Sequence, residues 1–293
     1  MRVDNKPISV YEKAFPQSLG LEEKIMTARR MGFSGIEISI DSDPARLARL
    51  DWSKEELSKL RGIMAPAGFN IQSICLSAHR EIPLGSSDHV AARESLDIGL
   101  RAIDIASELE VPFVQIAGYF TSDGDWSESS RTRFIAALAE LVLKAERSGV
   151  QLALENVDGQ DVLNAQDGIQ IVREIDSPAL RLYVDVGNYV ANGLNALEEL
   201  QRAIPYACAI QLKDTRPGEF RRVEFGSGQV PFRELIEECL VDFATLPLSL
   251  ELWNDGNSNA HAERALAWFE RLWTDISSYR WDQLQSDDHS HSH

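Results

Sequence analysis

Short apolar runs alternate with longer stretches of mixed polarity along most of the chain. The short runs are rich in Val, Ile, Leu or aromatic residues and are bounded by turn residues, a pattern typical of buried parallel strands. We therefore predict eight strands, at residues 8–13, 35–41, 71–77, 113–119, 151–157, 180–186, 207–213 and 248–253.

The stretches between these runs place apolar residues at helical spacing. Ser53 and Glu56 have the spacing of a capping box, and Gly32 follows a periodic stretch as a C-cap. We predict helices at residues 21–31, 53–65, 90–109, 133–147, 165–175, 196–204, 232–241 and 259–277.

Eight alternating β/α units predict a (β/α)₈ TIM barrel, and the length of 293 residues fits one such barrel. An open doubly wound sheet is the alternative, because periodicity does not show whether a sheet closes. We expect one domain over residues 1–281 and a disordered polar tail over residues 282–293, which contains three histidines.

Composition and charge exclude several classes of partner. A formal net charge of −17 is the opposite of what a nucleic-acid-binding surface needs. No apolar run reaches the roughly 18 residues of a membrane span, and the start of the chain lacks the pattern of a signal peptide. Three scattered cysteines favour a reducing compartment, so we expect a cytoplasmic protein. If it assembles, a homodimer is expected from general frequency alone.

Polar side chains occur where four consecutive predicted strands end. They are Glu155, Asp185, Gln211 and Glu251. In a barrel, the carboxyl ends of the strands meet around one mouth, where converging carboxylates repel one another unless a cation lies between them. Oxygen ligands suit Mn²⁺, Mg²⁺ or Co²⁺. The alternative is that each carboxylate pairs separately with an Arg or Lys at the rim.

Over residues 7–275 the chain resembles the L-ribulose-5-phosphate 3-epimerases (L-xylulose-5-phosphate 3-epimerases) of the xylose isomerase-like TIM-barrel superfamily. The number and order of the matching segments make the resemblance specific. The segments are Tyr11-Glu12-Lys13-Ala14, Leu50-Asp51-Trp52-Ser53, Cys75-Leu76-Ser77-Ala78-His79-Arg80, Pro83-Leu84-Gly85-Ser86, Ala117-Gly118-Tyr119, Asp185-Val186-Gly187-Asn188, Lys213-Asp214-Thr215-Arg216-Pro217-Gly218 and Phe225-Gly226-Ser227-Gly228.

The resemblance implies one divalent metal ion (Mn²⁺, Mg²⁺, Co²⁺ or Zn²⁺) bound by Glu155, Asp185, Gln211 and Glu251. Relatives typically have histidine at the third position. The glutamine carbonyl is a neutral, hard oxygen donor that should bind Zn²⁺ less well than imidazole does. It either coordinates directly, binds through water, or marks a weakened site.

The resemblance also implies the reaction, a 3-epimerisation that converts L-xylulose 5-phosphate to L-ribulose 5-phosphate. The C3 proton lies next to the C2 carbonyl, and its removal gives an enediolate that a metal ion stabilises. Glu155 and Glu251 would take and return the proton. His79 and Asn188 would contact the sugar, although each is otherwise an ordinary loop or capping residue.

A cluster of cations follows the seventh predicted strand, in contrast to the acidic remainder of the chain. Phosphate sites in TIM barrels often lie in the loops after strands seven and eight, where accessible backbone N–H groups form an anion nest. The alternative is that the arginines pair with Asp214, Glu219 and Glu224. The phosphate-binding candidates are Lys213, Arg216, Arg221, Arg222 and the segment Gly226-Ser227-Gly228.

Two other functions remain open from the sequence. An aldose–ketose isomerase acting on a hexulose 6-phosphate would use the same metal and carboxylates. A non-catalytic sugar-phosphate binding protein would result if Gln211 abolishes the metal site. A DNA-repair phosphodiesterase of the same superfamily is disfavoured, because such enzymes need many histidine ligands and a basic DNA track. The aromatic residues Tyr11, Trp52 and Tyr119 are assigned mainly to core packing, as is Trp253.

Overall fold

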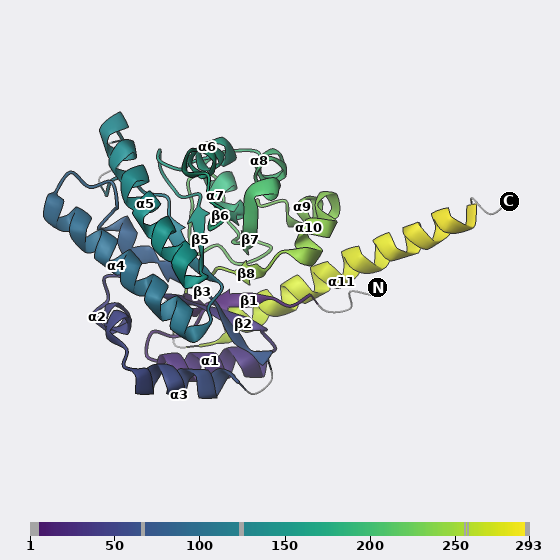
Figure 1. Cartoon of the computed structure of the whole chain (residues 1–293). Helices are drawn as coiled ribbons and strands as arrows, with labels where there is room; N and C mark the ends of the chain where they lie inside the picture. The colour runs from purple at the N-terminus through teal and green to yellow at the C-terminus, as the bar shows by residue number, and fades with distance from the viewer. Residues whose placement is uncertain (1–5, 66–67, 123–125, 255, 257, 291–293) are drawn as a thin grey trace.

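The eight apolar runs form eight parallel strands that close into a barrel in sequence order, with β8 pairing back to β1 (Figure 1). The computed structural model describes residues 6–65, 68–122, 126–254, 256 and 258–290, of which 279–290 are described as backbone only. Closure excludes the open doubly wound sheet. The strands are β1 (Ser9–Tyr11), β2 (Gly35–Ser39), β3 (Asn70–Leu76), β4 (Phe113–Ala117), β5 (Gln151–Glu155), β6 (Leu180–Asp185), β7 (Ala207–Leu212) and β8 (Leu248–Leu250).

Helices surround the barrel on its outside (Figure 1). Their apolar faces pack against the outward side chains of the strands in one large hydrophobic core. The helices are α1 (Leu21–Met31), α2 (Pro44–Leu47), α3 (Lys54–Met64), α4 (His89–Leu109), α5 (Glu128–Ser148), α6 (Ala165–Ile175), α7 (Val186–Ala191), α8 (Ala196–Ala203), α9 (Phe232–Glu238), α10 (Leu240–Thr245) and α11 (Ala260–Ser290).

Local signals fix several helix ends. The Ser53 hydroxyl accepts the N–H of Glu56, and the Glu56 carboxylate accepts the N–H of Ser53, so the predicted capping box at the start of α3 is present. Gly32 ends α1 with φ 106°, a left-handed conformation that favours glycine.

The structure differs from the expected helices at two places near the C-terminus. The stretch 232–241 forms two helices, α9 and α10, that meet at Cys239. A disordered tail was expected from residue 282, but α11 continues through Ser290 because the chain after Ala260 contains neither glycine nor proline to stop it. The last residues of the expected tail, 291–293, lie outside the described residues.

The inside of the barrel contains a buried carboxyl group below the mouth. Glu37 of β2 accepts hydrogen bonds from Tyr183, from the Ser73 hydroxyl at 2.9 Å and from the Ser249 hydroxyl at 2.5 Å. Burial raises the pKa of Glu37, although these hydrogen bonds oppose the change. This network links β2, β3, β6 and β8, and it satisfies polar groups that would otherwise be unpaired inside the barrel.

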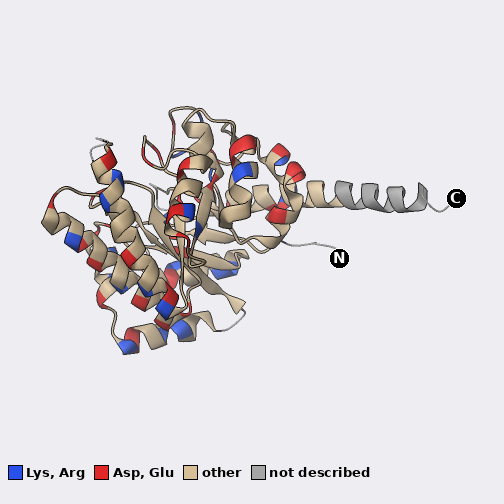
Figure 2. Cartoon of the chain, turned by 45° about the horizontal axis from the view of Figure 1, so that its top comes forward, with Lys and Arg blue, Asp and Glu red and all other residues tan. Residues whose placement is uncertain are grey.

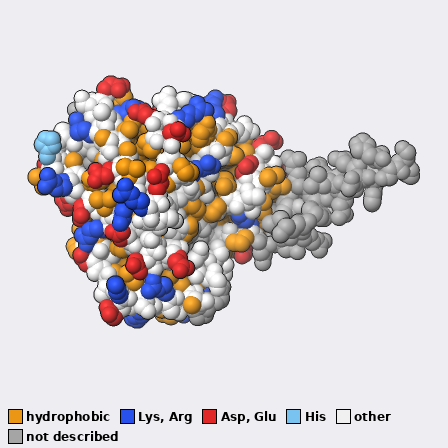
Figure 3. Space-filling model, viewed as in Figure 1, with side chains coloured by type: hydrophobic (Ala, Val, Ile, Leu, Met, Phe, Trp, Pro, Cys, Tyr) orange, Lys and Arg blue, Asp and Glu red, His pale blue; other side chains and the backbone are white. Residues whose placement is uncertain are grey.

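Acidic and basic side chains are interspersed over the outer helices (Figures 2 and 3). Among the described residues, no helix combines the length and the apolar character that crossing a membrane requires.

Candidate active site

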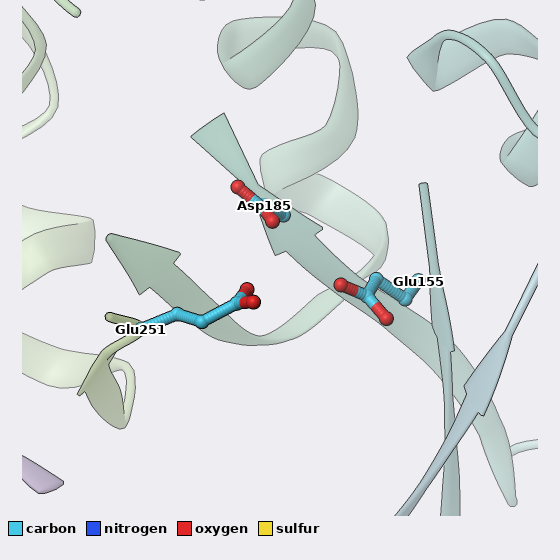
Figure 4. Close-up of side chains that lie close together, drawn as sticks. All are labelled: Glu155, Asp185 and Glu251. Atoms are coloured by element: carbon cyan, nitrogen blue, oxygen red, sulfur yellow. The ribbon is translucent and has the colours of Figure 1, made fainter. Parts of the chain in front are cut away.

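Three buried carboxylates meet at the carboxyl end of the barrel. Glu155 is the last residue of β5, Asp185 is the last of β6, and Glu251 directly follows β8. Figure 4 shows their side chains pointing toward one another, and one oxygen from each lies within 4.8 Å of the others. The parallel strands place three residues that are far apart in sequence around one point.

Lys213 lies beside these carboxylates. It directly follows β7, and its Nζ lies 2.6 Å from Asp185 Oδ2 and 3.2 Å from Glu251 Oε2. Lys213 was expected to bind phosphate, and the structure instead pairs it with two of the acids. Three carboxylates and one ammonium leave a formal charge of −2, which a divalent cation would neutralise.

Gln211 offers a free acceptor at the same end of the barrel. It pairs in register with Asp185, borders the same cavity as Glu155 and Glu251, and is buried. Its Oε1 has no hydrogen-bond partner within the described part of the chain. An unpaired buried carbonyl oxygen beside clustered carboxylates is a donor set that fits a divalent ion with oxygen ligands.

The acidic cluster shifts the pKa values of its own members. Burial and the charges of Asp185 and Glu251 raise the pKa of Glu155 well above its usual value. Burial raises the pKa of Asp185 to about 6, against the opposing effect of Lys213. Burial on its own would lower the pKa of Lys213, but the surrounding carboxylates outweigh it and raise that pKa. A negative, desolvated site of this kind favours added positive charge.

Trp253 orients Glu251 and lies against two cations. Its indole Nε1 donates a hydrogen bond of 2.8 Å to Glu251 Oε1. The Nζ of Lys13 lies 4.6 Å from the centre of the Trp253 ring, and the Cζ of Arg221 lies 5.0 Å from it. Lys13 also pairs with Asp41 at 2.7 Å. The indole thus connects one carboxylate of the cluster to cations from the loops after β1 and β7.

Apart from Asp185, which is fully buried behind the lining, these groups border one cavity of about 540 Å³. Asn188 borders it too, with its Nδ2 donating to the Asn156 carbonyl at 2.8 Å. Of the residues that the structure describes, five cations line the cavity, and they are Lys13, Arg46, Arg80, Lys213 and Arg221.

Residues 25–272 match the family model described as xylose isomerase-like TIM barrel. The chain belongs to this family. L-ribulose-5-phosphate 3-epimerase UlaE of Salmonella typhi is 36% identical over 261 residues, which cover 89% of this chain and 92% of the relative. The corresponding enzyme of Salmonella paratyphi C is 37% identical over 268 residues. With these epimerases as relatives, the chain is an enzyme of the isomerase class.

Solved structures share the xylose isomerase-like barrel at lower sequence identity. An L-ribulose 3-epimerase superposes with a TM-score of 0.75 at 18% identity, covering 96% of this chain and 98% of that one. The 3-keto-D-glucoside 4-epimerase YcjR of E. coli gives 0.73 at 19% identity, with 90% and 98% covered. A family protein from Mycobacterium smegmatis in complex with magnesium gives 0.69 at 18% identity, with 93% and 98% covered. These likenesses show the fold.

Two residues expected to contact substrate lie elsewhere in this barrel. His79 is fully buried and is not among the residues that line the cavity; its Nε2 is 3.0 Å from the carbonyl oxygen of Ser95 in α4. Arg222 borders a separate cavity beside the start of α11. The motif that contains His79 follows the end of β3, but the side chain of His79 points toward α4 and not into the cavity.

The expected anion nest at Gly226-Ser227-Gly228 is filled from within the chain. Asp214 Oδ2 accepts the N–H groups of Gly226 at 2.8 Å and Gly228 at 2.9 Å, and its Oδ1 accepts that of Thr215 at 3.0 Å. A side-chain carboxylate thus occupies the place that a phosphate would need. Gly226 is therefore removed from the phosphate-binding candidates.

Sequence reasoning missed several polar residues of the cavity, among them Gln115, Lys13 and Arg46. Gln115 is a polar residue within the apolar run of β4. A polar residue in an apolar run is also what identified the candidates on β5 to β8, so the same search applied to the fourth strand would have found it. Lys13 lies at the end of the first predicted strand. Arg46 comes from α2, and no local pattern in the sequence marks it.

Proposed function

We propose that the protein is a metal-dependent 3-epimerase of a ketopentose 5-phosphate that interconverts L-xylulose 5-phosphate and L-ribulose 5-phosphate. The observation that carries the proposal is the buried cluster of Glu155, Asp185 and Glu251, two of whose members, Glu155 and Glu251, border one cavity. The substrate comes from the curated relatives, which are named L-ribulose-5-phosphate 3-epimerases and cover 89% of the chain.

The three carboxylates and the Gln211 carbonyl oxygen would hold the divalent ion. When bound, the ion supplies positive charge beside the ketose oxygens, which favours loss of the neighbouring C3 proton. Lys213 neutralises part of the negative charge of the same cluster.

Proton transfer at C3 is assigned to two glutamates. Glu155 and Glu251 come from β5 and the end of β8, so they approach the cavity from different sides. One takes the proton from C3, and the other returns a proton to the opposite face of the resulting enediolate. Trp253 restricts Glu251 to one orientation by its hydrogen bond.

The phosphate end is assigned to cations that lie around Trp253 and Asp41. Arg221 and Lys13 both lie over its ring and both border the cavity, and Arg46 borders it as well. Asp41 joins Lys13 to Arg46, with Arg46 Nε 2.8 Å from Asp41 Oδ1. These side chains replace the loop nest as the phosphate site, and Asn188 is left to contact a sugar hydroxyl.

The test is hydrogen exchange at C3. In deuterated buffer with Mn²⁺ or Mg²⁺, NMR should show the wild type exchanging the C3 hydrogen of L-ribulose 5-phosphate and producing L-xylulose 5-phosphate. Glu155→Gln and Glu251→Gln should each lose activity by roughly 100-fold or more, because each removes one proton carrier.

A panel of pentulose and hexulose phosphates separates the alternatives. Exchange at C1 with formation of an aldose would identify an aldose–ketose isomerase. Binding of the sugar phosphates without any exchange in the metal-loaded wild type would overturn the proposed reaction.

A further inference from the structure

Gln115 is a buried amide to which the described residues give no hydrogen bond. It lies in β4, it is 1% exposed, and both its Oε1 and its Nε2 are without a partner in the described part of the chain. It is nevertheless one of the residues that border the cavity. Buried polar groups are almost always paired, and an unpaired amide costs free energy, so its presence needs an explanation.

The neighbouring strands leave this amide unpaired. In register, Gln115 lies between Cys75 of β3 and Ala153 of β5. The Cys75 thiol lies 3.3 Å from the Ser77 hydroxyl, and alanine has no polar side-chain atom. A group that enters the cavity is therefore the natural partner.

The register places this amide near the reacting end of the cavity. Ala117 pairs with Glu155, and Gln115 precedes Ala117 by two residues, so both face the same side of β4. Gln115 therefore lies one layer below Glu155. The cations assigned to phosphate come from the segments after β1, β2 and β7, which are other strands of the barrel.

We propose that Gln115 is a positioning residue that recognises the hydroxyl and carbonyl oxygens of the hydroxyketone end of the substrate. Its Nε2 donates to one oxygen, and its Oε1 accepts from a hydroxyl. Rotation about the terminal side-chain bond of a glutamine costs little free energy. A small rotation can therefore expose the nearly buried Oε1 and Nε2 to the cavity. This inference rests on the proposed epimerase function and adds a contact that fixes C3 between the two glutamates.

The test replaces the amide with an apolar side chain of similar length, in Gln115→Met. The ligand-free variant should unfold in urea at the same or a higher concentration than the wild type, because it loses no protein hydrogen bond. Its kcat/KM for L-ribulose 5-phosphate should fall by about tenfold or more, and the loss should appear more in kcat than in KM because the contact orients the reacting carbon.

Gln72 of β3 provides a matched control. It is also a buried glutamine, but its Oε1 accepts from the Ser9 hydroxyl at 2.6 Å and its Nε2 donates to the Leu248 carbonyl at 3.5 Å. Gln72→Met should therefore lower the urea midpoint and leave kcat/KM unchanged.

The outcomes separate this inference from the proposed function. If the wild type is active and Gln115→Met is equally active, the positioning role is overturned but the proposed function is not. The same conclusion follows if Gln115→Met lowers the urea midpoint as much as Gln72→Met does. A wild type that neither binds nor turns over any pentulose phosphate would overturn the proposed function, and the role of Gln115 with it.

Discussion

At the scale of single residues, identical side chains differ in role according to what surrounds them. Gln72 has both amide atoms hydrogen-bonded inside the protein, whereas the buried Oε1 of Gln211, at the same end of the barrel as the three carboxylates, has no partner among the residues that the structure describes. The sequence predicts that Gln211 lies at a strand end, but it does not show whether its oxygen is used. That depends on side chains from other strands.

His79 differs from Gln211: it lies in a motif that predicts a substrate contact, but its side chain is buried inside the protein. Burial lowers its pKa from 6.5 to about 4, so the folded protein holds it neutral where the unfolded chain already takes up a proton. The unfolded state therefore binds more protons between about pH 6.5 and pH 4. Stability from this residue is complete above pH 6.5 and is lost as the pH falls toward 4.

The unfolding free energy of the wild type should fall between pH 7.5 and pH 5. We predict that this fall is smaller by about 2 kcal/mol in His79→Gln. Urea unfolding at the two pH values measures the difference. His89→Gln, at an exposed position in the first turn of α4, is the control and should keep the wild-type pH dependence. An unchanged dependence in His79→Gln would contradict the buried neutral imidazole.

At the scale of elements, hydrophobic periodicity predicted every strand and most helices. The predicted strands end later than the observed ones, by one to three residues, because the apolar or polar residues that follow each strand do not show where the ladder stops; after β1, for example, Glu12–Ala14 already form a 3-10 helix. The helices α2 and α7 were missed, since four and six residues are too short to show a helical period. These short helices follow β2 and β6 and contribute Arg46 and Asn188 to the cavity.

Two glycines within helices should respond oppositely to alanine. Gly62 of α3 has no atom within 4 Å of an added Cβ, whereas a Cβ on Gly187 of α7 would collide with the backbone carbonyl of Lys213. We predict that Gly62→Ala raises the unfolding free energy by about 0.4–1 kcal/mol with unchanged activity. Gly187→Ala should lower stability and kcat together, because α7 and the Lys213 segment must move apart.

Urea unfolding and C3 exchange measure both variants under the same conditions. Equal behaviour of the two would show that the contact between Gly187 and the Lys213 backbone does not position the site.

At the scale of the whole molecule, the site combines two halves of the barrel. The metal-binding candidates come from β5 to β8 and were predicted, because each lies at the end of its own apolar run. The partners of Lys13 and Lys213 were not predictable, since each ion pair joins different β/α units that come together only in the folded chain. The Asp214 hydrogen bonds to the following loop are likewise visible only in the folded chain.

Because the cluster carries a formal charge of −2, metal binding should stabilise the whole fold. We predict that Mn²⁺ at roughly 100 times its Kd raises the unfolding free energy by about 3 kcal/mol, and that a chelator reverses the effect. Asp185→Asn should abolish most of this shift. Gln211→His should give a larger shift with Zn²⁺ than the wild type does, because imidazole suits zinc better than an amide oxygen.

Thermal or urea unfolding with and without each ion measures these shifts. Equal metal-induced stabilisation in Asp185→Asn and wild type would place the ion elsewhere.

The carboxylate of Asp214 has a consequence for how this barrel can change its substrates. Backbone N–H groups are present whatever the side chain is, so substitutions do not remove an anion site that they form. A barrel that binds phosphate through such groups therefore keeps its preference for phosphorylated compounds. Here those amides are already satisfied by the chain itself. Under the proposed function, recognition of the phosphate then depends on exchangeable side chains such as Arg221. We therefore expect that a few substitutions at these positions would let the proposed site accept unphosphorylated sugars without disturbing the loop.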